Sequence, residues 1–260
     1  MTINPSRLSI VVPCYNESTR LPPSRFVAFA RTHTDRLHFI FVNDGSTDAT
    51  AEVLQEMALE VPGSISIVTL LKNGGKAEAV RTGLRIAIAG GTKEAAYIDA
   101  DLATPLHEVL RLWEIFCARA ADIVIGSRVA LHGYAIDRNL TRHYTGRVFA
   151  TLASMVLQWR AYDTQCGAKF FRVNPTLIWA LNDAFVSRWG FDIELLGRLT
   201  IGSPEAPPIP VSRIVEVPLE KWTDVPGSKI GIGSMVKTVA ELVLINADLR
   251  KRRSIKKSKP

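Results

Sequence analysis

The sequence predicts an α/β fold with a mostly parallel central sheet flanked by helices. Short runs rich in β-branched and aromatic residues alternate with helical segments, which is the pattern of βαβ units. A polar cluster follows each run, as expected where the strands of a parallel sheet end. The 260 residues, 47% of them hydrophobic, suffice for a stable core. One principal domain is therefore the expectation.

The first half of the chain holds the strands and helices that can be predicted most directly. Ser46-Thr47-Asp48 is expected to cap a helix over residues 49–60, and a Gly pair precedes a second helix over residues 76–89. The expected strands cover residues 8–12, 38–42, 65–71, 95–98 and 123–126.

The alternation stops after residue 130. There the sequence predicts a long helix from about residue 140 to 160, a polar and aromatic stretch over residues 163–171, and a helix starting near Phe191. We expect a domain over residues 1–249 with a nucleotide-binding half (about 1–130) and an acceptor half (about 131–249). A basic, disordered tail is expected at residues 250–260.

The net charge of +7 is unevenly distributed. Residues 246–260 carry seven Lys or Arg and one Asp, a net +6, so the rest of the chain is almost neutral. Because the basicity belongs to the tail, nucleic acid is not an expected partner.

Several features indicate a cytoplasmic protein. Cys14, Cys117 and Cys166 are odd in number and widely spaced, which fits neither a disulfide framework nor a zinc site. The residues before the first strand lack the apolar core of a signal peptide. The longest apolar run outside the strands, residues 148–157, is far shorter than the roughly 20 residues that span a bilayer. No transmembrane segment is expected.

Two common nucleotide-binding motifs are excluded. No Gly precedes Gly45, so the first strand cannot open a G-x-G-x-x-G turn. Gly75-Lys76 lacks both the upstream Gly and the following Ser or Thr of a P-loop. Neither NAD binding nor ATP hydrolysis is favoured.

Asp99 and Asp101 follow the strand expected at residues 95–98. In an extended backbone, a spacing of two residues directs both carboxylates to the same side. Two close carboxylates repel each other unless a cation lies between them. Mg²⁺ or Mn²⁺ meets that need and leaves coordination positions for substrate phosphates. Asp99-Ala100-Asp101 is therefore the candidate metal site, and a polar strand end that caps the next helix is the alternative.

Other strand ends offer candidate nucleotide contacts. Asp44 precedes Gly45-Ser46 and suits a hydrogen bond to a base or ribose, although a turn residue is the alternative. Lys76 and Arg128 could neutralise a diphosphate, or could be solvated surface cations. Trp189 and Trp222 could stack on a sugar ring, or belong to the core.

Seven segments taken together carry a family resemblance. They are residues 10–17 (IVVPCYNE), 42–48 (VNDGSTD), 99–104 (DADLAT), 126–128 (GSR), 163–171 (DTQCGAKFF), 188–194 (RWGFDIE) and 226–229 (PGSK). The chain resembles the family-2 inverting glycosyltransferases over about residues 8–250, and within them the dolichyl-phosphate β-glucosyltransferases. The resemblance implies a GT-A nucleotide-diphospho-sugar transferase fold with a metal cofactor, Mg²⁺ or Mn²⁺.

The resemblance also implies roles for individual residues. Asp101 would ligate the metal, and Asp99 would contact the ribose or a metal-bound water. The implied nucleotide contacts are Pro13, Tyr15, Glu17 and Asp44, and the residues implied around the phosphates are Arg128, Gln165 and Lys229.

The implied reaction moves a hexose, glucose from UDP-glucose, to a polyprenyl phosphate at the cytoplasmic membrane face. A phosphate acceptor is already a dianion near neutral pH and needs no general base. A hydroxyl acceptor needs one, and the candidates are Asp192 and Glu194, of which one is expected to face the crevice. A soluble enzyme with a hydroxyl acceptor and an inactive nucleotide-sugar binding module are the alternatives.

The C-terminal region could bind a membrane surface. An apolar stripe is followed by Arg250-Lys251-Arg252-Arg253, which suits a helix on an anionic membrane surface. A helix packed on the domain with a solvated tail is the alternative. The stripe consists of Ile232, Met235, Val236, Val239, Leu242 and Val243.

Overall fold

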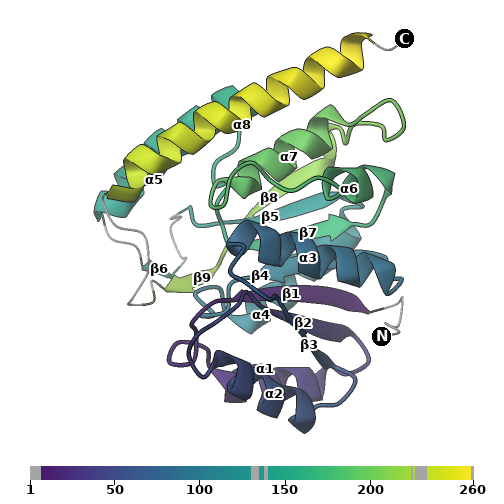
Figure 1. The fold of residues 1–260 in the computed structure, drawn as a ribbon, viewed down its shortest axis with the longest axis vertical. Coiled ribbons are helices and arrows are strands. Elements are labelled where there is room, and N and C mark those ends of the chain that lie inside the picture. The colour runs from purple at the N-terminus through teal and green to yellow at the C-terminus, as the bar shows by residue number, and fades with distance from the viewer. Residues whose placement is uncertain (1–6, 130–134, 138–139, 224, 226–232, 259–260) are drawn as a thin grey trace.

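The computed structural model describes residues 7–129, 135–137, 140–223, 225 and 233–258. Seven strands form one mixed sheet in the order β3-β2-β1-β4-β7-β5-β8 (Figure 1). The strands of this sheet are β1 (Leu8–Cys14), β2 (Leu37–Asn43), β3 (Ile65–Thr69), β4 (Glu94–Ile98), β5 (Ile123–Ser127), β7 (Ala168–Arg172) and β8 (Ile214–Pro218).

The strand directions bring five strand ends to one edge of the sheet. β1 pairs in parallel with β2 and β4, and β2 pairs in parallel with β3. β7 runs antiparallel between β4 and β5, so β5 again points the same way as β4. The carboxyl ends of β1 to β5 therefore lie at the same edge, as the sequence predicts.

Helices cover both faces of the sheet. In β2, Phe39 and Phe41 belong to the core under one set of helices, whereas Ile40 and Val42 belong to the core on the other face. Burial on both faces explains why the parallel strands are continuous hydrophobic runs. The first face is covered by α1 (Pro23–Thr32), α2 (Thr50–Glu60) and α4 (Leu106–Ala118), and the second by α3 (Lys76–Ala89), α5 (Leu140–Leu157), α6 (Pro175–Ala180), α7 (Phe191–Ile201) and α8 (Gly233–Ser258).

Smaller elements complete the fold. β6 (Ala135–Asp137) and β9 (Lys221–Thr223) form a separate two-stranded parallel sheet. A short 3₁₀ helix (Val211–Arg213) precedes β8. Helices α5 and α8 lie side by side along one end of the molecule (Figure 1). Among the described residues, no helix is both long enough and apolar enough to cross a membrane.

The expectation of a disordered tail from residue 250 is wrong for the described part, because α8 continues to Ser258. Three contacts explain the helix. Arg252 pairs with Asp248 at 2.7 Å, and Arg253 donates to the carbonyl of Val156 at 3.0 Å. Lys256 Nζ donates to the carbonyl of Ile201 at 2.5 Å. The basic segment is thus attached to the domain.

Two members of the apolar stripe expected on this helix have described side chains, and the two differ in exposure. Leu242 is buried, as are Ile245 and Leu249 further along α8, while Val243 is 65% exposed. The side chains of the stripe's other four members, between residues 232 and 239, lie outside the described residues. Of the two stripe members whose side chains are described, Leu242 packs on the domain and Val243 faces solvent.

Candidate active site

The loops after β1 and β2 are joined where the strands end. The Asn16 amide donates to Ser46 Oγ at 3.0 Å, and the Glu17 amide donates to Thr50 Oγ1 at 2.8 Å. Asn16 has a φ of 51°, a left-handed conformation that Asn tolerates better than most residues. These contacts hold the Pro13–Glu17 segment beside β2.

Asp99 and Asp101 lie in the turn after β4 rather than on a strand. The strand-alternation argument for their common direction is therefore wrong, although the two carboxylates still interact electrostatically. Each also has a cationic partner. Lys76 Nζ lies 2.5 Å from Asp99 Oδ1, and Arg20 Nη2 lies 2.6 Å from Asp101 Oδ2.

The electrostatics of this carboxylate pair suit a divalent ion. Burial and the charge of Asp99 raise the pKa of the Asp101 carboxyl, despite the opposing effects of Arg20 and Lys76. Burial lowers the pKa of Lys76, but nearby carboxylates, Asp99 first, outweigh it and raise that pKa overall. Within the described residues, no group of three or more His, Cys, Asp or Glu forms a metal cluster. Two carboxylates are nevertheless a suitable set for Mg²⁺ or Mn²⁺, because such ions keep waters and take further oxygens from substrate phosphates.

Gly167 fixes the position of Asp99. Its carbonyl accepts the Asp99 amide at 3.1 Å. A Cβ at Gly167 would lie 1.9 Å from Asp99 Oδ2, so no other residue fits without moving the carboxylate. The loop before β7 thus forms one wall of the carboxylate site.

Asp44 is 2% exposed and anchors the loop before α3. It accepts the Gly74 amide at 2.7 Å, the Gly75 amide at 2.8 Å and the Asn73 side chain at 3.0 Å. Burial raises the pKa of Asp44, against the lowering effect of the two backbone amides. A direct contact of Asp44 with a base or ribose stays a prediction. The observed contacts show that Asp44 also holds the loop before α3 in place.

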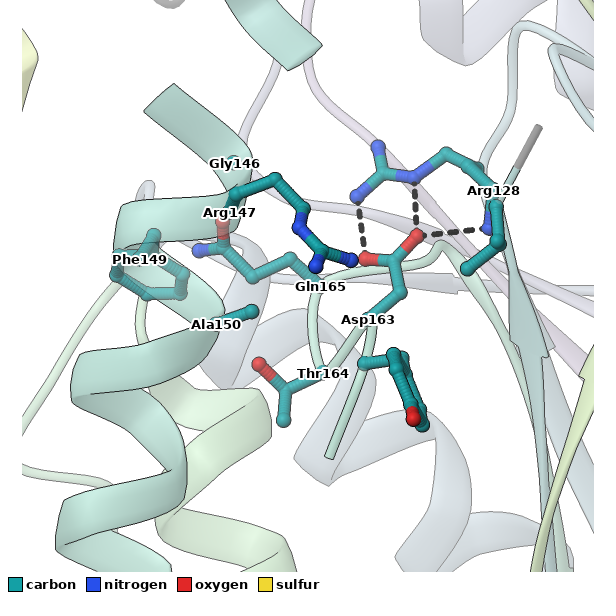
Figure 2. Close-up of a pocket in the computed structure, with 10 residues that line it drawn as sticks. Arg128, Gly146, Arg147, Phe149, Ala150, Asp163, Thr164 and Gln165 are labelled. Atoms are coloured by element: carbon teal, nitrogen blue, oxygen red, sulfur yellow. Dashed lines mark hydrogen bonds and ion pairs between the residues drawn. The ribbon is translucent and has the colours of Figure 1, made fainter. Parts of the chain in front are cut away.

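Arg128 is held by Asp163 in a two-pronged ion pair. Its Nε and Nη2 donate to the Asp163 carboxylate at 2.7 and 2.8 Å, and its backbone amide adds a third bond (Figure 2). Burial lowers the pKa of the Arg128 guanidinium. The charge of Asp163 outweighs this effect and keeps the pKa of Arg128 above its ordinary value. The guanidinium lies 5.6 Å from the ring centroid of Trp222, which is buried. Of the two alternatives for Trp222, the structure supports the core position, since the ring is buried in the core and lies beside Arg128.

A small pocket opens beside this ion pair. Arg147 of α5 points toward Asp163 across the pocket, and Thr164 and Gln165 line its floor (Figure 2). The Thr164 hydroxyl is buried and has no hydrogen-bond partner within the described part of the chain. The cavity measures about 50 Å³, well below the roughly 300–1,000 Å³ of pockets that enclose a whole small ligand. Its size suits one charged group of a larger ligand.

Asp192 and Glu194 are both buried in ion pairs. Asp192 lies 2.7 Å from Lys169 Nζ and accepts a hydrogen bond from the Tyr97 hydroxyl. Glu194 lies 2.5 Å from Arg198 Nη2, and both of these side chains are fully buried. The two carboxylates diverge, as predicted, and only Asp192 lies near the crevice, where its charge acts on Lys76. Neither is placed as an exposed general base.

The remaining predicted residues are distributed as follows. Tyr15 is 36% exposed at the end of β1, and Trp189 is 49% exposed before α7. Glu17 lies 3.3 Å from Arg20, and Ala100 is buried between the two carboxylates. Pro13 is the penultimate residue of β1. Lys229 lies outside the described residues.

Comparison with known proteins decides the family. The model of "Glycosyl transferase family 2" matches residues 9–176. The chain belongs to glycosyl transferase family 2. This family-2 enzyme is 33% identical to a dolichyl-phosphate beta-glucosyltransferase of Trichomonas vaginalis, over 91% of this chain and 70% of that protein. It is 32% identical to the dolichyl-phosphate beta-glucosyltransferase of Drosophila melanogaster, over 86% of this chain and 69% of that protein.

Solved structures confirm the GT-A fold of the family-2 enzyme. Glucosyl-3-phosphoglycerate synthase of Mycobacterium tuberculosis, in complex with Mn²⁺, UDP-glucose and phosphoglyceric acid, matches with a TM-score of 0.64. The identity is 17%, over 93% of this chain and 80% of that one. The mannosyltransferase of Pyrobaculum calidifontis, in complex with GDP-mannose and Mn²⁺, matches with a TM-score of 0.55 and 18% identity, over 96% of this chain and 67% of that one.

Several residues of the site escape prediction from the sequence. Arg20 lies on no motif, and its contact with Asp101 spans 81 positions. Asn73 and Arg188 lie in polar segments of the sequence. Their contact joins residues that are 115 positions apart, so the sequence does not predict it. Asp163 and Arg188 each begin one of the family segments, but the segments do not indicate that Asp163 pairs with Arg128, 35 positions away.

Proposed function

We propose that this enzyme transfers glucose, with inversion, from UDP-glucose to a polyprenyl phosphate. The proposal rests on the burial and ion pairing of the two candidate general bases. Asp192 and Glu194 are both committed to buried ion pairs, with Lys169 and Arg198. An acceptor that brings its own negative charge is therefore favoured over a hydroxyl that must lose a proton. The names of the similar dolichyl-phosphate glucosyltransferases support the same acceptor.

Asp99 and Asp101 would hold the Mg²⁺ or Mn²⁺ ion, which supplies Lewis acidity toward the departing diphosphate when bound. Lys76 stands at the first position of α3, where the helix dipole also favours an anion. Its raised pKa keeps it protonated at neutral pH. Lys76 can therefore exchange its contact with Asp99 for a donor phosphate. Pro13, Tyr15 and Glu17 would border the uridine.

The pocket beside Arg128 is the proposed place of the acceptor phosphate. Arg147 offers a donor there and Gln165 adds an amide, while the buried Thr164 hydroxyl has no hydrogen-bond partner among the described residues. The charge of Asp99 acts on Arg128, so the pocket and the carboxylate site are neighbours. A phosphate oxygen in the pocket is thus close to the sugar that leaves the diphosphate, which is the requirement for direct transfer.

A donor-by-acceptor screen with Mg²⁺ or Mn²⁺ tests the proposal. UDP-glucose with a short polyprenyl phosphate should give glycolipid and UDP in equal amounts, whereas the corresponding polyprenol should not react. Arg147→Ala should raise the KM for the acceptor and leave the KM for UDP-glucose unchanged. Arg160→Ala, an exposed cation just beyond α5 and outside the pocket, is the matched control. Transfer to hydroxyl acceptors alone would overturn the proposal.

The same proposal includes peripheral binding at the cytoplasmic membrane face through the basic end of α8. Arg250 and Lys251 are exposed there. Reversing both charges to Glu should weaken binding to anionic vesicles, since each basic residue contributes on the order of 1 kcal/mol near the surface. Activity on a water-soluble acceptor should persist. Vesicle binding that is unchanged would remove this role from α8.

A further inference from the structure

The turn before α7 reaches the proposed donor site. Arg188 Nη2 donates to Asn73 Oδ1 at 2.6 Å, and the Asn73 side chain donates to Asp44 Oδ2 at 3.0 Å. Gly75 has a φ of 89°, and a Cβ there would lie 2.8 Å from Arg188 Nε. The 186–190 turn thus packs directly on the loop that Asp44 anchors.

Two carboxylates hold this turn from opposite sides. Glu194 of α7 accepts the Val186 amide at 2.9 Å and the Ser187 amide at 3.3 Å. Glu241 of α8 accepts the Gly190 amide at 3.0 Å, the Trp189 amide at 3.4 Å and the Ser187 hydroxyl. The turn is therefore shared between its own helix and α8.

Glu241 holds the chain just before α7. Gly190 is the N-cap residue of α7 and makes no side-chain cap, and Glu241 accepts the backbone amides of Gly190 and Trp189. A carboxylate near a helix N-terminus is also favoured by the helix dipole. Here the carboxylate comes from a different helix, about 50 positions away in the sequence.

The packing of α8 on α7 fixes the register of this contact. A Cβ at Gly190 would lie 2.9 Å from Ile245 Cδ1, and one at Gly197 would lie 2.4 Å from Leu249 Cδ1. Ile245 and Leu249 are fully buried. Since both glycines admit the side chains of α8 at close range, the helix cannot slide without losing the Glu241 contact.

We infer that Glu241 is a positioning residue for donor binding, acting through the 186–190 turn, Arg188 and Asn73 on the loop before α3. The inference rests on the proposed function, because it assigns the donor nucleotide to the edge that this loop borders. Helix α8, which carries the basic residues, is thereby connected to the donor site by named hydrogen bonds. Glu241 itself touches no substrate in this arrangement.

Binding of UDP with Mn²⁺, measured by calorimetry, tests the inference. Glu241→Ala should weaken UDP binding about three- to tenfold, in the range of couplings carried through packed networks. Glu241→Gln keeps a carbonyl oxygen for the amides and should stay within about twofold of the wild type. Asp248→Ala, on the same helix but bonded to Arg252 instead of the turn, is the matched control. Equal affinities of Glu241→Ala and Asp248→Ala would overturn the inference.

A double-mutant cycle identifies the route. Arg188→Ala should weaken UDP binding at least as much as Glu241→Ala, and the combined variant should lose no more than Arg188→Ala alone, because both act through one connection. If the losses of UDP binding free energy in the two single variants add up in the double variant, Glu241 does not act through Arg188. If Glu241→Ala does not fold, Ser187→Ala removes the hydroxyl that joins Glu241 to Gly190 and serves as the milder variant.

Amide hydrogen exchange separates this inference from the proposed function. If the wild type does not bind UDP, the donor assignment fails, yet the connection can still be measured without ligand. Glu241→Ala should then speed exchange of the Gly74 and Gly75 amides, which donate to Asp44, and Asp248→Ala should not. Unchanged exchange at these two amides would refute the positioning role.

Discussion

The donor edge and the region behind it are built differently. The donor edge consists of short loops at the ends of parallel strands, joined by contacts such as Asn16 with Ser46 and Asp44 with Gly74. The supporting region, formed by β7, α7 and α8, depends on charges buried in the core, such as Lys169 with Asp192. The first arrangement leaves cations and carboxylates partly open to a ligand, whereas the second removes them from water. We therefore expect substitutions at the edge to affect activity and substitutions behind it to affect stability.

The strongest test of this difference is Glu194→Ala. Removing one partner of a fully buried ion pair leaves Arg198 without its carboxylate and costs about 3–5 kcal/mol. The midpoint of denaturant unfolding should fall accordingly. Glu56→Ala, which removes an exposed carboxylate of α2, is the control. The folded fraction should still transfer glucose at saturating UDP-glucose, because Glu194 is not a base, although the variant also frees the Val186 and Ser187 amides of the 186–190 turn. Loss of activity without loss of stability would contradict the comparison.

Asp101→Ala should show the opposite behaviour. We expect a loss of transfer of about a hundredfold, or about 2.7 kcal/mol in the activation barrier, because one carboxylate of the proposed metal site is missing. The thermal midpoint should change little, since the side chain is only partly buried at the molecular edge. Steady-state rates at saturating donor and metal are the measurement. Near wild-type rates would place the metal site elsewhere.

Gly167→Ala lies on the boundary between the two regions. The added methyl group cannot coexist with the present position of Asp99, and overpacking of this kind costs about 1–3 kcal/mol. Both stability and transfer should therefore fall. Gly126→Ala is the control, because its Cβ would meet the Cys166 and Leu219 side chains at 3.1 Å, where a small shift suffices. A fully active Gly167→Ala enzyme would show that Asp99 has room to move.

The smallest effect is expected at Asp48, which links the first two loops. It accepts bonds from Ser18 and Thr50, and these outweigh burial and lower its pKa to about 2. The ordinary Asp value is about 3.9, so the stabilisation is present above that pH and is lost as the pH falls toward 2. Asp48→Ala should cost about 1 kcal/mol at neutral pH. The difference from the wild type should shrink as the pH falls below the ordinary Asp pKa and be lost only below about pH 2, and a pH-independent difference would contradict the assignment.

The sequence could predict the donor edge because its signals are local. The strand of residues 38–42 is continuous and apolar, and the polar residues after it, including Asp44, must lie at the sheet edge once the strands are parallel. The helix over 76–89 was found from its flanking glycines and matches α3. The sequence places Asp99 and Asp101 at the end of β4, as the structure does, but it does not predict that they lie in a turn.

In the supporting region, the sequence predicts the helix that begins at Phe191, but not the side-chain contacts, because these join residues that are distant in the sequence. β7 contains Lys169, whose buried charge between Ala168 and Phe170 has no explanation until Asp192 is placed beside it. The first two loops show the same limit on a smaller scale. The Ser46-Thr47-Asp48 cap was expected from sequence, yet α2 begins at Thr50, and Asp48 also binds Ser18. Nothing in the local pattern indicates from which of several donors a carboxylate will accept its hydrogen bonds.

The continuation of α8 through its basic segment has a consequence for the helix itself. Aligned peptide dipoles leave roughly half a negative charge at the C-terminal end of a helix, and a cation there contributes about 0.3–1 kcal/mol. Lys256 falls in the last turn of α8, where this effect acts. It therefore stabilises the segment that displays the basic residues, whether or not a membrane is present. Its removal weakens the end of the helix as well as lowering its charge.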